Sequence, residues 1–411
     1  MDESLSLLLE GYGWLPDRRR RSPNGVVRTR LMGQRAIGLC GPDAARFFYD
    51  ENHIRRHGAI PGPVQSTLFG HGALHTLDGA AHRHRKSPFL SLVTDESIAD
   101  LTRSVCAAWD DNAWPVDKPV VLFDEAARVL TRGVTRWAGL HTTGEMAKDL
   151  VAMVDGFATP GPRHWRARAA RRRQEAALAR TVTMARSTTV PAGTAVDLLS
   201  RFEENGELLS PRLAAVELLN VIRPTVAVCW FVAFAAHALH HWPEHRELLR
   251  AGGDAYALAF AHELRRFYPF APFIAGHAVK DLSWQGEHIP AGALVLLDLY
   301  GQNHDSSLWT DPYTFRPGRL LNHEIGAFEL VPQGAGDPHT GHRCPGEPFT
   351  VGILRALAVR LARLDFRFPK QDWTISLRRV PARPADGAIL IPQQPDREGI
   401  SCTPMEIRSP S

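Results

Sequence analysis

One cysteine of this chain stands in a setting that favours chemistry over packing. Cys344 directly precedes Pro345, and proline commonly occupies the first position of a helix. A thiol at a helix start lies close to unpaired backbone N–H groups and to the positive end of the helix dipole, which lower its pKa. The spacing therefore predicts a thiolate, the form of cysteine that binds metal ions. The alternative is an ordinary buried cysteine, which is the more common situation for an isolated one.

A second group of charged residues lies upstream of this cysteine. Glu263 and Arg266 are three residues apart, so they share one face of any helix that contains them, and Arg316 follows between Phe315 and Pro317. We expect these three charged side chains to form a buried structural cluster beneath a cofactor. Taken alone, such a Glu-Arg pair is also common on helix surfaces.

Taken in order, Glu263, Arg266, Arg316 and the loop ending at Cys344 resemble the signature of the cytochrome P450 superfamily. The resemblance extends over nearly the whole chain and implies a single domain spanning 1–411. It also implies a mainly α fold with a small β region, in which haem b is buried between a long central helix and the cysteine loop. Cys344 would then be the thiolate ligand of the haem iron, which favours cleavage of an O–O bond.

The centre of the chain indicates one branch of this superfamily. Ordinary monooxygenases carry an acid–threonine pair in the central helix, whereas Arg223 and Pro224 occupy the corresponding place here. This pair resembles the bacterial fatty-acid peroxygenases, which use hydrogen peroxide directly and need no reductase. The cysteine loop departs from the general superfamily pattern at Asp337 and Thr340, in a way that resembles the longer peroxygenase loop. Further segments agree with that branch: residues 58–61, 67–70 and 265–270.

The resemblance gives Arg223 and Pro224 specific roles. Arg223 would bind the carboxylate of a fatty acid by charge-assisted hydrogen bonds, and that carboxylate would move the proton that cleavage of peroxide requires. Pro224 would kink the helix at this point. Because the acid is held by its carboxylate, hydroxylation at the α or β carbon, or decarboxylation to a terminal alkene, is expected. The alternative for Arg223 is a side chain that extends to solvent from a helix end.

His75 matches a position where this branch carries glutamine or histidine, and histidine resembles the alkene-forming members. A ring that donates a hydrogen bond there would affect the balance between hydroxylation and loss of carbon dioxide. The alternative is a loop histidine bonded to the backbone. Leu68, Phe69 and Phe270 are predicted to be apolar walls of the substrate pocket, and they suit an ordinary core equally well.

The two carboxylates of a buried haem need cationic or N–H donors. The residues predicted to supply them are Arg56, His82, Arg85 and Lys86, and His342 is predicted as a further cofactor-binding residue. Arg56 and Arg85 are the preferred contacts. A further basic stretch, residues 163–173, is expected to form a solvated face near the substrate entrance.

The elements that must position these side chains are mostly helices. Ser210 and Pro211 resemble the N-cap and first residue of a helix that continues to about residue 241, so a long central helix is expected. Further helices are predicted at about 254–268 and 345–364. Short strands are predicted between 278 and 300.

The composition limits the class of protein. With 411 residues, 44% of them apolar, the chain can bury a large core. Its five cysteines are scattered without CxxC spacing, which argues against a disulfide framework and favours a reducing cytoplasm. The longest apolar stretch, 226–239, is short for a membrane span, so an integral membrane protein is not expected.

Alternative functions stay open beside the preferred one, a peroxygenase that uses a fatty acid and hydrogen peroxide without an obligatory redox partner. A reductase-dependent monooxygenase would dock its electron donor on residues 163–173. A haem-binding sensor or nucleic-acid-binding protein would use these residues together with residues 18–21. The net charge of +4 and the lack of a recognisable nucleic-acid module count against nucleic acid as a partner.

Overall fold

The computed structural model describes residues 2–251 and 253–394, so part of the predicted domain 1–411, including Cys402, lies outside the described residues. The helices are α1 (Ser4–Glu10), α2 (Trp14–Arg21), α3 (Pro42–Tyr49), α4 (Gly62–Val64), α5 (Gly79–Ser91), α6 (Asp95–Asp110), α7 (Leu122–Ala138), α8 (Met146–Asp155), α9 (Pro162–Ser187), α10 (Ala195–Ser200), α11 (Pro211–Val226), α12 (Val228–His241), α13 (Glu244–Ala251), α14 (Gly253–Phe267), α15 (Leu299–Asn303) and α16 (Glu347–Arg363). The strands are β1 (Val27–Leu31), β2 (Gln34–Leu39), β3 (Ile54–Arg55), β4 (Val120–Val121), β5 (Glu203–Glu204), β6 (Glu207–Leu208), β7 (Phe273–Ala278), β8 (Leu282–Trp284), β9 (Glu287–Ile289), β10 (Leu294–Asp298), β11 (Phe366–Arg367) and β12 (Ile389–Pro392). The fold is therefore mainly α with a small β region, as predicted.

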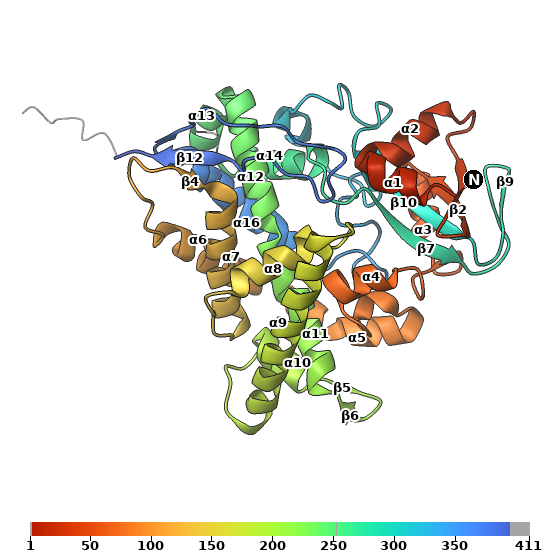
Figure 1. Ribbon diagram of the computed structural model, residues 1–411, viewed down its shortest axis with the longest axis horizontal. Helices are drawn as coiled ribbons and strands as arrows, with labels where there is room; N and C mark the ends of the chain where they lie inside the picture. The colour runs from red at the N-terminus through yellow and green to blue at the C-terminus, as the bar shows by residue number, and fades with distance from the viewer. Residues whose placement is uncertain (1, 252, 395–411) are drawn as a thin grey trace, which may run out of the picture.

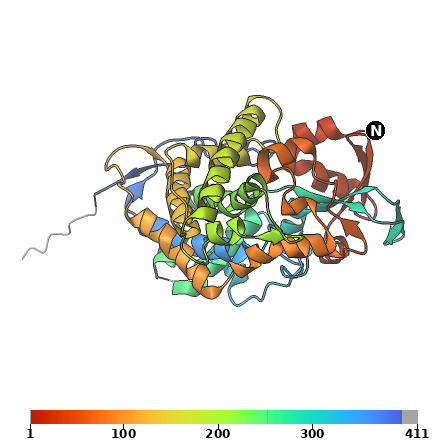
Figure 2. The same cartoon turned by 90° about the horizontal axis from the view of Figure 1, so that it is seen from below.

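The strands form one larger sheet beside the helices (Figure 1). Its order is β1-β2-β10-β7-β3, and β10 pairs parallel with β2 and antiparallel with β7. Every residue of β10 is buried, which explains the unbroken apolar run Leu294–Leu297 in place of an alternating pattern. The helices α1, α2 and α3 lie next to this sheet, and α6 to α14 form the helical part of the molecule (Figures 1 and 2).

The predicted central helix is present as α11 and α12, which follow one another with only Ala227 between them. The Ser210 hydroxyl accepts a hydrogen bond from the Leu213 N–H (3.2 Å), and Pro211 is the first residue, as expected for a helix start. Pro224 lies three residues before Ala227. It has no N–H to donate to the Asn220 carbonyl four residues earlier, yet α11 continues through it to Val226.

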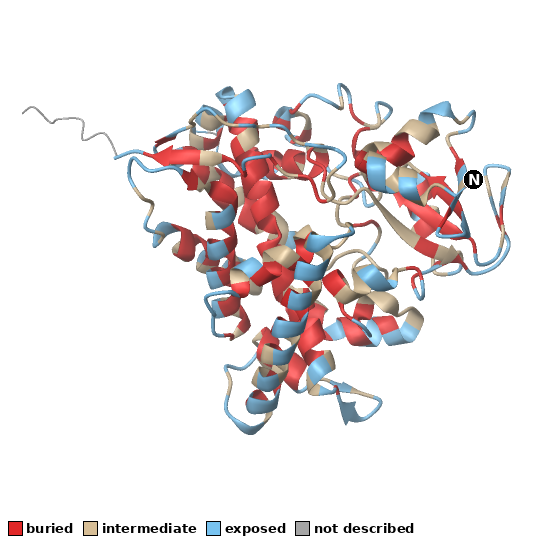
Figure 3. Cartoon of the chain, viewed as in Figure 1, coloured by how far each residue is buried: buried red, intermediate tan, exposed pale blue. Residues whose placement is uncertain are grey.

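The central helix is the core of the helical part and is coloured as buried along most of its length in Figure 3. The run Pro211–His241 is long and apolar enough to cross a membrane, but 83% of its most apolar window is buried inside the protein. Trp230 packs edge-on against Phe123 of α7, with ring centroids 4.7 Å apart. Its apolar composition is therefore explained by contacts with α7, α14 and α16.

The helices predicted at 254–268 and 345–364 are both present, with small differences at their ends. The helix α14 agrees with the prediction of 254–268 to within one residue at each end. The helix after the cysteine begins at Glu347, because Pro345 lies in a turn and Gly346 is the N-cap. The helix start is therefore two residues further from Cys344 than predicted.

Candidate active site

A cavity of about 1270 Å³ lies between the central helix and the loop that contains Cys344. Among the described residues that line it, none is Asp or Glu, whereas many carry cationic or imidazole groups. These are Arg56, His75, His82, Lys86, Arg163, His164, Arg223, Arg265, His342, Arg343, Arg378 and Arg379. A cavity with this lining suits anionic ligands. Of the four described cysteines, Cys344 alone lines it.

The loop at Cys344 is fixed by backbone and side-chain hydrogen bonds. The Cys344 N–H donates to the carbonyl of Gln333 (3.0 Å), and Lys86 Nζ donates to the carbonyls of Gly341 (2.5 Å) and Arg343 (2.8 Å). Lys86 therefore holds the loop in addition to lining the cavity.

Burial raises the pKa of the Cys344 thiol, although the Gly346 N–H and the nearby charge of Lys86 act in the opposite direction. The prediction that the helix start lowers this pKa is wrong for the protein alone, because burial outweighs these donors. Coordination by a metal ion deprotonates a thiol outright.

A buried arginine that the sequence analysis missed supports this loop. Arg265 is 1% exposed, donates to the Gln333 side-chain oxygen (2.9 Å) and forms an ion pair with Glu347. Glu347 also accepts from Arg343 Nε (2.8 Å). The available signal was the Arg265-Arg266 doublet, since adjacent helical residues point in different directions and therefore serve different partners.

The predicted structural cluster is present with one change of member. Arg266 donates from Nε and Nη2 to the Glu263 carboxylate (2.7 and 2.8 Å), and both residues are 0% exposed. Arg316 reaches this carboxylate only through its backbone N–H (2.8 Å), while its side chain is 48% exposed. The third guanidinium is that of Arg319, whose Nε lies 3.2 Å from Glu263. The prediction for the Arg316 side chain is wrong because the short helix Pro317–Leu320 turns Arg319 back toward Glu263.

Arg223 lies in the wall of the cavity, on α11. It is 5% exposed, its Nη2 donates to the Asn220 side-chain oxygen (3.3 Å), and its buried Nε has no hydrogen-bond partner among the described residues. Burial, together with the charge of Arg171, lowers the pKa of Arg223 to about 9, so the side chain remains cationic at neutral pH. It is therefore a buried cation with unused donors beside an acid-free cavity.

His75, in the short helix Leu74–Thr76, adjoins the same Phe69 ring as Arg223, whose Cζ lies 5.8 Å from the ring centre. It lines the cavity, its ring centroid is 4.4 Å from that of Phe69, and its Nδ1 has no hydrogen-bond partner among the described residues. Burial, followed by the charge of Arg223, lowers the pKa of His75 well below its usual range. The imidazole is therefore neutral at physiological pH and can donate or accept one hydrogen bond.

The apolar walls are where the sequence placed them, since Leu68, Phe69 and Phe270 all line the cavity. The backbone carbonyls of Leu68 and Phe69 accept hydrogen bonds from Arg171 (2.6 and 2.9 Å). Arg171 is 2% exposed, so the prediction that the whole basic stretch 163–173 is solvated is wrong at this residue. A charge run in a sequence does not distinguish an exposed arginine from one that binds buried carbonyls.

Four of the predicted cofactor contacts line the cavity, namely Arg56, His82, Lys86 and His342, but Arg85 does not. Arg85 is bonded instead to Glu217 (3.1 Å), and it also forms an ion pair with Glu204. The prediction for Arg85 is wrong because these two carboxylates already satisfy its guanidinium.

The sequence analysis missed Glu217, although this residue is bonded both to the turn that carries His75 and to Asn220, which contacts Arg223. Its side chain is 0% exposed and accepts hydrogen bonds from the Leu74 N–H (2.9 Å), from Arg85 (3.1 Å) and from the Asn220 amide (3.2 Å). Leu74 precedes His75, and Asn220 holds Arg223. The segments that carry His75 and Arg223 are therefore linked through one buried carboxylate.

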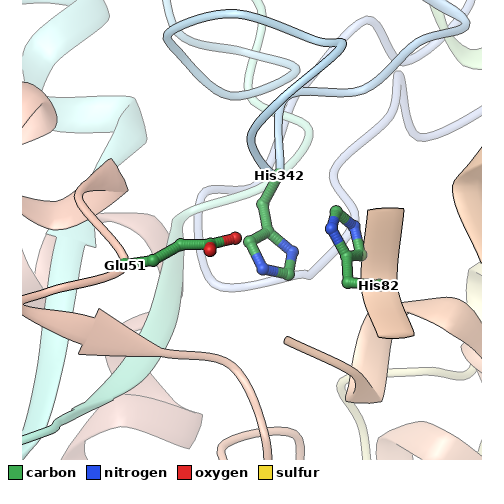
Figure 4. A group of neighbouring side chains, drawn as sticks. All are labelled: Glu51, His82 and His342. Atoms are coloured by element: carbon green, nitrogen blue, oxygen red, sulfur yellow. The ribbon is translucent and has the colours of Figure 1, made fainter. Parts of the chain in front are cut away.

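At the other side of the cavity, the rings of His82 and His342 stack with centroids 3.9 Å apart, and Glu51 points toward them (Figure 4). His82 Nδ1 is buried and has no hydrogen-bond partner among the described residues, whereas His342 Nε2 lies 3.4 Å from Asp78 Oδ1. Ligand atoms of all three residues lie within 4.8 Å of one another, a spacing that also suits a metal ion. Because both imidazoles line the cavity beside Arg56, they fit the acidic edge of a haem, which needs such donors.

Comparisons with known proteins agree with this geometry. The family model described as "Cytochrome P450" matches residues 255–380. Cytochrome P450 1A2 of Mus musculus is 29% identical over 199 residues, which are 41% of this chain and 37% of that protein. Carnosic acid synthase of Rosmarinus officinalis is 32% identical over 30% of this chain and 25% of that protein. These matches thus span well under half the length of those curated relatives.

Solved structures match over almost the whole length. Cytochrome P450SP alpha (CYP152B1) in complex with (R)-ibuprophen is 38% identical, with a TM-score of 0.91, over 95% of this chain and 98% of that chain. Ligand-free cytochrome P450 OleT is 34% identical, with a TM-score of 0.93, over 96% and 98% of the two chains. A variant of OleT with the same identity was solved in complex with arachidonic acid, with a TM-score of 0.92 over the same shares of the two chains.

Proposed function

Because the chain belongs to the cytochrome P450 family and therefore binds haem through a cysteine thiolate, we propose that it is a hydrogen-peroxide-dependent fatty-acid peroxygenase. It would hydroxylate long-chain fatty acids at the α or β carbon, decarboxylate them to terminal alkenes, or do both. We propose Cys344 as the ligand, since it is the one described cysteine in the cavity. We also propose that the chain is one cytoplasmic domain and needs no redox partner.

One observation carries this proposal. Arg223 is a buried cation with free donors in a cavity whose described lining contains no carboxylate. A buried charge is costly unless it is paired, so the counter-ion must come from a ligand. A fatty acid supplies one carboxylate and an apolar chain, which match Arg223 and the walls formed by Leu68, Phe69 and Phe270.

Each residue of the cavity has its own role in the proposed reaction. Haem, when bound, supplies the oxidising chemistry, and a thiolate ligand favours O–O bond cleavage. Arg223 binds the fatty-acid carboxylate and fixes the α and β carbons at the inner end of the cavity. The bound carboxylate provides a proton-transferring carboxylate, a group that the described lining lacks. The neutral ring of His75 donates a hydrogen bond near the same place, and Pro224, which also lines the cavity, leaves the Asn220 carbonyl without its helical donor.

The alternative, a reductase-dependent monooxygenase, requires the chain itself to deliver protons to dioxygen. The described cavity lining offers Thr225 but no acid beside it, because Arg223 and Pro224 occupy that part of α11. A peroxide-dependent peroxygenase therefore fits this part of the sequence better than a reductase-dependent monooxygenase does.

The decisive experiment uses haem-loaded protein, a long-chain saturated fatty acid and hydrogen peroxide, with products analysed by gas chromatography and mass spectrometry. We expect α- or β-hydroxylated acid, or an alkene one carbon shorter, without any reductase. Arg223→Ala should lose this activity and recover part of it toward a non-acidic substrate when a short carboxylic acid is added. The matched control is Arg212→Ala on the same helix, whose side chain is 76% exposed. Turnover that appears only with a reductase system would favour the monooxygenase.

A further inference from the structure

The opening of the cavity is surrounded by exposed apolar side chains. These residues, here called the mouth patch, are Leu5 (68% exposed), Leu8 (50%), Leu9 (61%), Met32 (58%) and Trp165 (62%). Leu8, Met32 and Trp165 also line the cavity, so it reaches the surface among them. Single exposed apolar residues are ordinary on protein surfaces, but a group of large ones around one opening indicates a binding surface.

The segments that carry the mouth patch are tied together into one rim. The hydrogen bonds that join them are Met32 N–H to Ser4 Oγ (2.7 Å), Tyr12 N–H to the Leu377 carbonyl (2.9 Å) and Arg163 Nη2 to the Val380 carbonyl (3.2 Å). They connect the β1–β2 turn to α1, the short helix Gly11–Gly13 that follows α1 to the segment 376–380, and that segment to the first turn of α9. The mouth patch is therefore held on a continuous frame around the opening.

The rim carries three arginines without ion-pair partners among the described residues, together with one exposed carboxylate, that of Asp2, which accepts from the N–H groups of Ser4 (3.0 Å) and Gly33 (2.6 Å). Arg166 and Arg378 are exposed, and the Cζ atom of Arg168 lies 5.1 Å from the centre of the Trp165 ring. None of these three arginines forms an ion pair with another described residue. An apolar surface edged by unpaired arginines is complementary to a layer of anionic lipid, in which apolar side chains enter the acyl boundary and cations meet the headgroups.

The acidic residues of α1 do not cancel this charge. Glu3 and Glu10 both form ion pairs with Arg18, and the Arg18 Nη1 to Glu10 distance is 2.7 Å. The exposed leucines of α1 therefore lie beside a group in which one arginine offsets part of the charge of two carboxylates.

We propose that the mouth patch docks the protein on an anionic lipid surface, from which the fatty acid enters the cavity directly. The identity of the transferred molecule rests on the function proposed above, whereas the docking itself does not. A long-chain fatty acid partitions into lipid layers because every methylene group removed from water adds to the hydrophobic driving force. Docking therefore spares the substrate passage through water.

The test is co-sedimentation of the full-length, haem-loaded protein with vesicles of phosphatidylglycerol or of phosphatidylcholine. We expect at least about tenfold tighter binding to phosphatidylglycerol, weakened by added salt. Leu5→Glu/Leu9→Glu should lower this affinity by about tenfold or more. These two residues do not line the cavity. The matched control is Leu208→Glu/Leu248→Glu, two residues that are 46% and 44% exposed on β6 and α13, away from the opening.

Equal binding to both kinds of vesicle, or equal loss in the mouth-patch and control variants, would overturn the docking proposal. A dimer in sedimentation velocity that Leu5→Glu/Leu9→Glu dissociates, without vesicle binding, would overturn it in favour of self-association. Peroxide-driven turnover of a water-soluble, shorter fatty acid is measured in parallel and should be the same in the wild type and the mouth-patch variant. Vesicle binding without any such turnover would reject the proposed enzyme activity and leave docking in place.

Discussion

Replacing Glu217 by glutamine tests whether this one buried carboxylate positions both the turn that carries His75 and the Asn220 side chain that contacts Arg223. The carboxylate accepts from Leu74, Arg85 and Asn220, and glutamine offers a single acceptor oxygen and an NH₂ group of similar shape. At least one donor therefore loses its acceptor. Removing one partner of a buried ion pair costs about 3–5 kcal/mol, and since Arg85 keeps Glu204 we expect about 2–4 kcal/mol lower unfolding free energy.

The assay has a stability arm and a kinetic arm. Urea unfolding followed by circular dichroism compares Glu217→Gln with Glu204→Gln, a matched control that removes only the half-exposed partner of Arg85. The kinetic arm measures kcat/KM for a fatty acid with peroxide, which we expect to fall about tenfold in Glu217→Gln, because both Asn220 and the Leu74 turn shift. A Glu217→Gln variant as stable and as active as Glu204→Gln would show that the carboxylate positions nothing.

Four further predictions follow from individual contacts. Arg319→Ala should lower the unfolding free energy in urea by about 1.5–3 kcal/mol, and Arg316→Ala by no more than about 0.5 kcal/mol, since only Arg319 donates its side chain to a buried carboxylate. His75→Gln should lower the ratio of alkene to hydroxylated acid in the product analysis, and an unchanged ratio would remove His75 from the control of product. Burial raises the pKa of Asp298 from 3.8 to about 7. Between these two pH values the unfolded chain has lost the Asp298 proton while the folded protein keeps it, so the unfolding free energy of the wild type falls by about 1.4 kcal/mol for each unit by which the pH rises. Urea unfolding of Asp298→Asn at several pH values should lack this slope. Without fatty acid, the unfolding free energy of Arg223→Met in urea should exceed that of the wild type by about 1–3 kcal/mol, because the substitution removes a buried unpaired cation. A less stable Arg223→Met would mean that the guanidinium is already satisfied.

Much of the fold was predictable because its signals are local. A serine–proline start, a long apolar run and one internal proline predicted α11 and α12, and the Glu263–Arg266 spacing predicted a shared helix face. The start of α16 was placed two residues early, since a proline after Cys344 fits the last turn before a helix as well as its first residue. The sequence does not distinguish these two positions.

A site residue was predictable where the sequence offers its side chain no competing partner within the chain. Arg223, among apolar residues of a buried helix, had no neighbour in sequence to neutralise it, and it is unpaired in the structure. Arg85, Arg171 and Arg316 lie in basic or loop segments where many partners are available. Which arginine meets Glu263 or Glu204 depends on how distant segments pack, so residue type and spacing could not assign them.

The distribution of charge in the cavity joins the fold to the proposed chemistry. Cationic and imidazole groups line it at two places, near Cys344 for the carboxylates of haem and at Arg223 for the carboxylate of the substrate. Since the described lining has no carboxylate of its own, the proposed function makes the substrate the source of the carboxylate that moves protons. Under that proposal, peroxide that enters a cavity without fatty acid meets no carboxylate. The absence of acids that leaves Arg223 unpaired would then couple peroxide cleavage to the presence of a fatty acid.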